Sequence, residues 1–318
     1  MDRIRKTRQL ATESASDLVR SKVKELKDGE GKVDVMSLLV KANLSENENS
    51  RLNAEEIHSQ MRQIFVAGHE TTANSVGWAL LELCRHPEMQ DRLRKEIRAK
   101  EREIQARHGE AGGFSAMDLE STEYLNAVLK VDLNAISLCI LKQYFFVLAG
   151  NSTLPSSFFL PHSRTFGADD CIPLDKPIIS TRGEQITEIP VPKGTKVMIS
   201  VAAYNRTKEI FREDAHSFNP DRWLNHNQKT GQRIPGLNLY ANLATFSTGI
   251  RSCIGWRFAV LEAQCFLVEL INNFEFSSTQ ESEIVRREPC IVMLPTIEGE
   301  LDKGPQLILK VSVSEKEE

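Results

Sequence analysis

The 318-residue chain has an ordinary globular composition, with 41% hydrophobic and 26% charged residues, which excludes an intrinsically disordered protein. Its 40 basic residues are interspersed with 44 acidic ones and the formal net charge is -4, so charge gives no reason to expect a nucleic-acid partner. The six cysteines include no C-x-x-C pair, which argues against a disulfide framework or a zinc finger and favours a reducing, intracellular compartment.

The first fifty residues are rich in charge. Residues 1–30 predict a helix with solvated faces, residues 33–42 a short amphipathic segment, and residues 41–50 a polar loop. Residues 1–20 contain no apolar run, so we expect neither a signal peptide nor a membrane anchor in the sequence as it stands.

A long helix is predicted from Ala54 to Arg85. Asn53 is a favourable N-cap, Glu56 stands at the capping-box position, and no proline intervenes before Pro87. Such a helix would be roughly 48 Å long. Its middle, residues 65–72, contains a glycine and two threonines, which lower helix propensity. A role other than helix stability is therefore indicated for this stretch.

The remaining elements alternate helices with short strands. Pro87 suits the first position of a helix that runs through residues 91–107 and stops at Gly109. Further helices are predicted at 121–130 and 255–273, and short strands within 178–200, with turns at Gly183 and at 192–194. The sequence therefore predicts a mostly α fold with a small β component.

Residues 246–255 read F-S-T-G-I-R-S-C-I-G and fit the pattern F-x-x-G-x-R-x-C-x-G. Five fixed positions should match by chance on the order of once in ten thousand sequences of this length. Gly249 and Gly255 allow a tight bend and a close approach to a flat ligand. Cys253 stands at the start of an apolar helix, a position that favours the thiolate form. The alternative interpretation is a buried apolar cysteine without a chemical role.

This stretch resembles the haem-binding loop of the cytochrome P450 family, in which a Cys thiolate holds the haem iron. The resemblance implies haem b as the cofactor, with Cys253 as the axial ligand of the iron. It also implies that Phe246 packs beside the sulfur, that Gly249 and Gly255 shape the loop, and that Arg251 pairs with a haem propionate. In this family the thiolate donates electron density that favours O–O cleavage.

Three further segments extend the resemblance. Residues 67–72, A-G-H-E-T-T, resemble the motif of the family's central helix, which implies that Glu70 and Thr71 deliver protons to bound oxygen. The alternative for Thr71 is a hydroxyl that bonds back to a carbonyl of its own helix. Residues 218–223 resemble the P-x-R segment, with Arg222 as its structural arginine. Arg164 resembles the strand arginine that contacts the second propionate.

The sequence departs from the family after Lys130. The family has an E-x-x-R motif there whose Glu and Arg lock with the P-x-R arginine, but residues 131–134 read V-D-L-N. We hypothesise that residues 131–163 are an aberrant insertion made of translated intron and out-of-frame exon. A Val codon begins with GT, as an intron does, and residues 151–156 can be coded so that a shifted frame encodes E-x-x-R. The alternatives are a natural insertion or a membrane helix, which its polar residues disfavour.

The resemblance as a whole implies one incomplete cytochrome P450 domain over residues 1–318, without the family's N-terminal helices. It implies a haem-thiolate monooxygenase that inserts one oxygen atom of O2 into an apolar small molecule, with electrons from a reductase. A parent enzyme would be expected at the endoplasmic-reticulum membrane. Two alternatives stay open: a P450-like isomerase or dehydratase that does not use O2, against which Glu70 and Thr71 argue, and a non-catalytic fragment that holds haem poorly or not at all.

Overall fold

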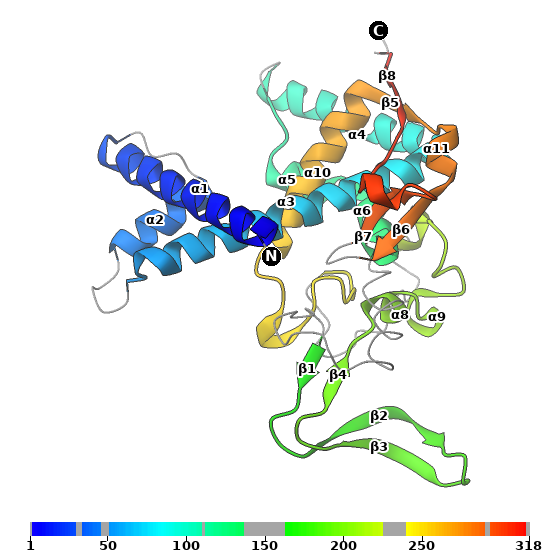
Figure 1. The fold of residues 1–318 in the computed structure, drawn as a ribbon. Helices are drawn as coiled ribbons and strands as arrows, with labels where there is room; N and C mark the ends of the chain where they lie inside the picture. The colour runs from blue at the N-terminus through cyan, green and yellow to red at the C-terminus, as the bar shows by residue number, and fades with distance from the viewer. Residues whose placement is uncertain are drawn as a thin grey trace. The chain divides into compact units, whose positions relative to one another are not determined.

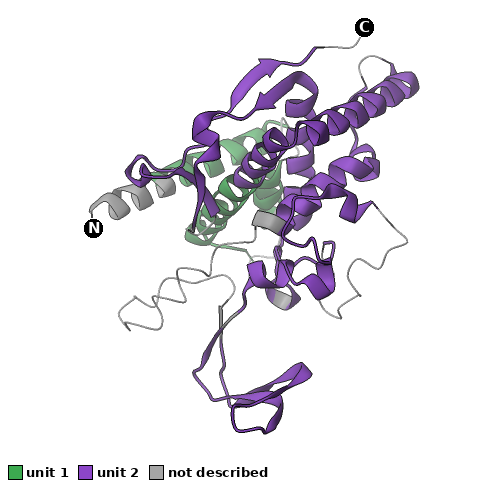
Figure 2. Cartoon of the chain, turned by 90° about the vertical axis from the view of Figure 1, so that its right-hand side faces the viewer, with its two compact units in different colours: residues 1–72 green, residues 73–318 purple. Residues whose placement is uncertain are grey.

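The computed structural model describes residues 2–29, 34–45, 51–109, 112–136, 163–224, 240–289 and 293–315. The chain divides into two compact units, residues 1–72 and residues 73–318, which Figure 2 shows in green and purple. The boundary between them falls inside the long helix α3, Ala54–Arg85.

The described residues of the first unit lie mostly in helices. It contains α1 (Asp2–Lys27), α2 (Val35–Ser45) and the beginning of α3. Its small core is formed by Ala15, Val40, Ile57 and Met61. The predicted capping box at the start of α3 is confirmed, since Glu56 N–H donates to Asn53 Oδ1 at 3.0 Å and Asn53 N–H to Glu56 Oε2 at 2.8 Å.

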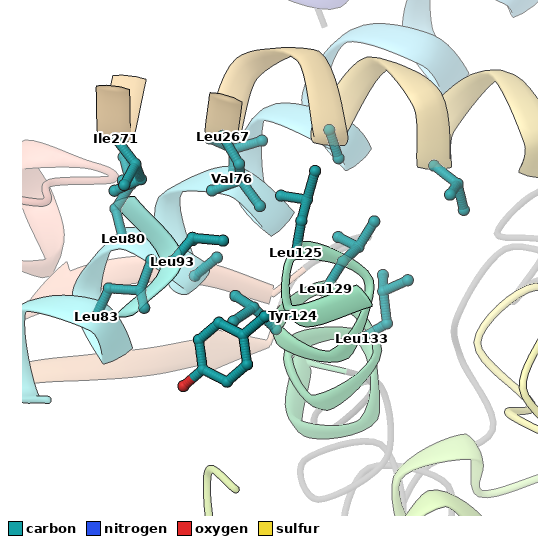
Figure 3. Close-up of a cluster of buried hydrophobic side chains, with 14 of the residues drawn as sticks. Val76, Leu80, Leu83, Leu93, Tyr124, Leu125, Leu129, Leu133, Leu267 and Ile271 are labelled. Atoms are coloured by element: carbon teal, nitrogen blue, oxygen red, sulfur yellow. The ribbon is translucent and has the colours of Figure 1, made fainter. Parts of the chain in front are cut away.

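The second unit holds the main hydrophobic core. Its described helices are α4 (Pro87–His108), α5 (Ala116–Ser121), α6 (Glu123–Ile136), α8 (Val201–Asn205), α9 (Lys208–Phe211), α10 (Trp256–Asn273) and α11 (Gln280–Glu283), with the end of α3. Leucines from α6 meet side chains of α3, α4 and α10 in this core, as Figure 3 shows. As predicted, Pro87 begins α4, and Gly109 ends it with a φ of 79°.

The described strands form four separate antiparallel pairs. These are β1 (Ser163–Thr165) with β4 (Lys196–Met198), β2 (Asp170–Ile179) with β3 (Gln185–Val191), β5 (Phe274–Ser277) with β8 (Lys310–Val313), and β6 (Val285–Pro289) with β7 (Met293–Ile297). Three 3-10 turns lie in the described residues: η2 (Pro220–Trp223), η3 (Gly249–Arg251) and η4 (Leu301–Lys303). The predicted turns at Gly183 and Gly194 are confirmed, with φ values of 82° and 86°. The fold is therefore mostly α with a small β component, as expected.

In the part of the chain that the structure describes, no helix combines the length and the apolar character needed to cross a membrane.

Helix α6 receives its N-terminal cap from another helix. Glu96 of α4 accepts hydrogen bonds from the backbone N–H groups of Tyr124 and Leu125, at 2.7 and 2.9 Å. These amides are among the first-turn donors that a helix cannot satisfy itself, and a carboxylate there also complements the helix dipole.

Replacing Glu96 by alanine should therefore lower the free energy of unfolding by about 1 to 3 kcal/mol, because two partly buried amides lose a charged acceptor. Urea unfolding followed by tryptophan fluorescence measures this, since the three tryptophans, at 78, 223 and 256, all lie in the second unit. Glu120→Ala, at an exposed position, is the matched control. Equal losses in the two variants would contradict the proposed cap.

Candidate functional site

The segment that begins at Tyr240 forms a loop that ends at Cys253. The backbone N–H of Cys253 donates to the carbonyl of Phe246 at 2.8 Å, which closes the loop. Gly249 has a φ of 72°, so the predicted need for glycine at this bend is confirmed. Gly255 has a φ of -90° and is the N-cap of α10, so its backbone conformation does not require glycine.

Cys253 is exposed, and exposed apolar residues follow it in the chain. Ile254 is fully exposed, and Phe258 is 55% exposed. A Cβ atom added to Gly249 or Gly255 would meet nothing within 4 Å. Space is therefore left beside both glycines, as the approach of a flat ligand would need.

Phe246 anchors the loop in the core. Its side chain is buried, and its ring lies 6.0 Å from that of Tyr240 in an edge-on arrangement and 6.5 Å from that of Trp256. Edge-on aromatic contacts of this kind add stability beyond the area they bury. The ring thus fixes the start of the loop, while the Phe246 carbonyl holds Cys253.

A comparison with protein families shows which family this chain belongs to. The sequence profile described as Cytochrome P450 matches residues 1–130 and 173–301. The chain belongs to the cytochrome P450 family. The match includes residues 1–50, where the sequence had shown no motif, and it stops at the Lys130 boundary at which the sequence departs from the family.

Several curated P450 proteins are similar to this chain. Cytochrome P450 monooxygenase 205 of Postia placenta is 32% identical over 306 residues, which cover 95% of this chain and 50% of that protein. Ganoderic acid synthetase CYP5150L8 of Ganoderma lucidum is 32% identical, with coverage of 89% and 47%. Cytochrome P450 monooxygenase claU of Ampulloclitocybe clavipes is 34% identical, with coverage of 96% and 52%. The chain spans about half the length of the curated relatives it matches.

Membership of the P450 family implies a haem cofactor, and the loop fits one. The exposed Cys253 thiol is a suitable ligand for haem iron, and Ile254 and Phe258, which follow it in the chain, expose apolar side chains that suit an apolar macrocycle. Arg251, at the end of η3, is exposed and offers a cation on the same loop. These features make the loop the candidate haem site of this P450.

The two residues predicted to relay protons lie in the other unit. Glu70 and Thr71 belong to residues 1–72, whereas Cys253 belongs to residues 73–318, so their approach to the haem loop stays a prediction. Both are exposed, and Thr71 Oγ1 donates to the carbonyl of Ala67 at 2.6 Å. This bond is the helix-internal arrangement that the alternative interpretation of Thr71 expected.

The two other predicted arginines occupy different settings. Arg164 lies on β1, opposite Val197 of β4, and its contact with a propionate stays a prediction. Arg222 has a side chain with 0% exposure that pairs with Asp214 at 3.2 Å and donates to the Ser217 carbonyl at 3.1 Å. Arg222 therefore holds its own loop together, in keeping with a structural role.

Helix α6 continues past Lys130 into the segment where the E-x-x-R motif is missing. Residues 131–136 extend α6, whereas residues 137–162 of the hypothesised insertion lie outside the described residues. Leu133 continues the apolar stripe of Leu125 and Leu129 and joins the core. Asp132 is also buried, at 1% exposure, and among the described residues neither of its side-chain oxygens has a hydrogen-bond partner.

Sequence reasoning missed one residue beside the loop. Asn205, at the end of α8, makes side-chain hydrogen bonds to Ala244 and Thr245, which directly precede Phe246. No local pattern marks this residue, because its partners are about 40 positions away.

Proposed function

We propose that the chain carries the haem-binding part of a P450 monooxygenase, in which Cys253 is the axial ligand of haem b. The observation that carries the proposal is the Cys253 loop of a P450 family member, closed by the bond from Cys253 N–H to the Phe246 carbonyl at 2.8 Å with the thiol exposed. When bound, a thiolate-held haem would supply the chemistry that activates O2 and inserts one oxygen atom into an apolar organic substrate.

The chain's own residues would hold and orient the cofactor. Cys253 would present its sulfur to the iron, and the buried ring of Phe246 would keep water from that side of the loop. Arg251 and Arg164 would neutralise the propionates as charge-assisted donors. Gly249 and Gly255 would let the macrocycle approach the backbone.

Protons and electrons would have to come from elsewhere in the protein and from a partner. Glu70 and Thr71 would pass protons to the oxygen, which requires the Thr71 hydroxyl to turn away from the Ala67 carbonyl. Electrons would come from a reductase. We propose a membrane association, at the endoplasmic reticulum, only for a full-length parent enzyme.

A second proposal, a non-catalytic fragment, is favoured by two observations. The chain spans about half the length of the curated relatives it matches, and the family match stops at residue 130. Two residues later comes Asp132, which is buried and has no side-chain hydrogen-bond partner among the residues that the structure describes. A loop whose supporting segment has been replaced would hold haem weakly or not at all. The single domain with an aberrant insertion at 131–163 remains part of this proposal.

The carbon monoxide difference spectrum of the reduced chain, purified with added haem, distinguishes the two proposals. We expect a thiolate-type band that is lost completely in Cys253→Ala, because the ligand atom is removed. Cys265→Ala, which removes another exposed cysteine from the same region, should keep the band. Failure of the parent chain to take up haem, or an unchanged band in Cys253→Ala, would refute the monooxygenase proposal.

A further inference from the structure

The segment that leads into the Cys253 loop is held by Asn205, the last residue of α8. This side chain is fully buried, with 0% exposure. Its Oδ1 accepts a hydrogen bond from the backbone N–H of Ala244 at 2.8 Å, and its Nδ2 donates to Thr245 Oγ1 at 2.9 Å. One side chain thus binds the two residues that directly precede Phe246.

The same hydrogen bonds reach helix α6. Thr245 Oγ1 donates to the carbonyl of Leu133 at 2.9 Å, and Asn134 Nδ2 donates to the carbonyl of Asn205 at 2.5 Å. Leu133, Asn134, Asn205 and Thr245 therefore form a closed ring, which we call the Asn205 ring. Asn134 and Asn205 are buried and Thr245 is half-buried, so these hydrogen bonds restrain the Ala244–Thr245 backbone relative to α6 and α8.

The backbone beside the Asn205 ring is held in an uncommon conformation. Asn242 and Ser247 have φ values of 58° and 59°, in the left-handed region that disfavours side chains. Such conformations persist where the surroundings impose them. Tyr204, the neighbour of Asn205, supplies part of this constraint, because its hydroxyl donates to the Asn242 carbonyl at 3.0 Å. Helix α8 thus holds the segment at two points.

We propose that Asn205 is a positioning residue for Cys253, and this rests on the proposed function in which Cys253 binds haem iron. The Asn205 ring fixes Ala244 and Thr245, Phe246 follows directly, and its carbonyl binds the Cys253 N–H. Loss of the ring releases the first of these anchors, so the loop samples conformations in which the thiol is displaced. A metal ligand needs this kind of support from residues that do not touch the metal.

Hydrogen exchange resolved to single amides tests this in the haem-free chain. Asn205→Leu removes both side-chain bonds, and the nearly isosteric Thr245→Val removes the hydroxyl of the Asn205 ring with less risk to folding. In both variants the Cys253 amide should exchange roughly ten- to a hundredfold faster, because local opening becomes easier. The amide of Ile97, fully buried in α4, should change much less.

Asn126→Leu is the matched control. Asn126 also donates from its side chain to backbone carbonyls, those of Leu119 at 2.9 Å and Thr122 at 2.7 Å, but not to the loop. Its loss should not favour exchange at Cys253 over exchange at Ile97. The proposal is overturned if Asn205→Leu and Thr245→Val accelerate the Cys253 and Ile97 amides equally, or leave the Cys253 amide unchanged.

Haem binding provides a second, separate measurement. If the parent chain shows the thiolate-type carbon monoxide band, Thr245→Val should convert part of it to a band without thiolate ligation, whereas Asn126→Leu should not. A full thiolate band in Thr245→Val would contradict the positioning role. If the unsubstituted 318-residue chain takes up no haem, the proposed function is refuted, but the positioning role is not. The exchange comparison still decides whether Asn205 holds the loop.

Discussion

Replacing Asp132 by asparagine should make the second unit more stable, by an amount that grows with pH. Burial raises the pKa of Asp132 well above its ordinary value of 3.8. Glu82 of α3 adds to this rise, and Arg287 of β6 opposes it. Since Glu82 and Arg287 pair with each other at 3.3 Å, the cation is already engaged by another carboxylate.

The direction in which stability changes with pH follows from the protons that the folded and unfolded chains bind. Above about pH 4 the unfolded chain releases the Asp132 proton, whereas the folded chain keeps it because its pKa is raised. The stability of the folded chain is therefore fully present below the unfolded pKa and falls as pH rises towards the folded pKa. The slope is at most about 1.4 kcal/mol per pH unit. Asparagine cannot ionise, so Asp132→Asn should match the parent near pH 4 and become progressively more stable than the parent as pH rises to 7.

Asp132→Leu should be more stable than the parent at both pH values. It removes the ionisable group and also the burial of polar oxygens that have no partner among the described residues, a cost of about 1 to 3 kcal/mol. The measurement is urea unfolding by tryptophan fluorescence at pH 4 and pH 7. Asp302→Asn, at an exposed position, should change little at either pH. A pH-independent difference between Asp132→Asn and the parent would show that Asp132 is not buried as a neutral acid.

Asp132 also bears on the hypothesised insertion. Proteins rarely bury a carboxyl group without a partner, because the cost is large compared with the total stability. Asp132, two residues after the family match ends at residue 130, is buried with no partner in the described part of the chain. Leu133, in contrast, fits the apolar stripe of α6. A segment that was not selected for this fold would be expected to fit at some positions and to fail at others, which supports the hypothesis.

Local signals in the sequence predicted the helix boundaries well. The Asn53–Glu56 capping box, Pro87 and Gly109 each act within a few residues, so their geometry can be read from spacing alone. The Cys253 loop was predicted for the same reason, since its closing bond joins residues only seven positions apart. The prediction that the loop needs glycine for its backbone conformation is confirmed at Gly249, whose φ is positive, but the φ of Gly255 is one that any residue can adopt.

Interactions between distant residues could not be predicted from these signals. Strand β5 pairs with β8, so that Phe274 faces Val313. Asn205 and Glu96 were not recognised, because an asparagine or glutamate on a helix gives no sign of which remote backbone it will bind. The continuation of α6 to Ile136 was missed because the prediction ended the helix where the family motif failed. The helix continues although the motif is absent, because Leu133 packs into the core.

Arg94→Met should lower the free energy of unfolding by about 3 to 5 kcal/mol. Arg94 of α4 is buried at 7% exposure, and it donates to the carbonyl of Ile271 at 3.0 Å and to that of Phe274 at 3.1 Å. These carbonyls lie at the C-terminal end of α10, where a helix has no internal donors left. The positive charge also complements the negative end of the helix dipole.

Methionine keeps most of the apolar stem but leaves both carbonyls without the Arg94 donor, and it also removes the ion pair with Asp91 at 2.7 Å and the bond to Gln90 at 2.9 Å. The loss therefore reports the polar contacts of Arg94 rather than packing. Lys95→Met removes a cation from the next, exposed position of α4 and should change stability by less than about 0.5 kcal/mol. Helix α10 begins three residues after Cys253. A strong effect of Arg94→Met would therefore mean that this helix is held at both ends. Arg94 holds its C-terminus, and the hydrogen bond between Phe246 and Cys253 holds the chain just before its N-terminus. A loss no larger than that of Lys95→Met would instead show that solvent replaces the Arg94 bonds.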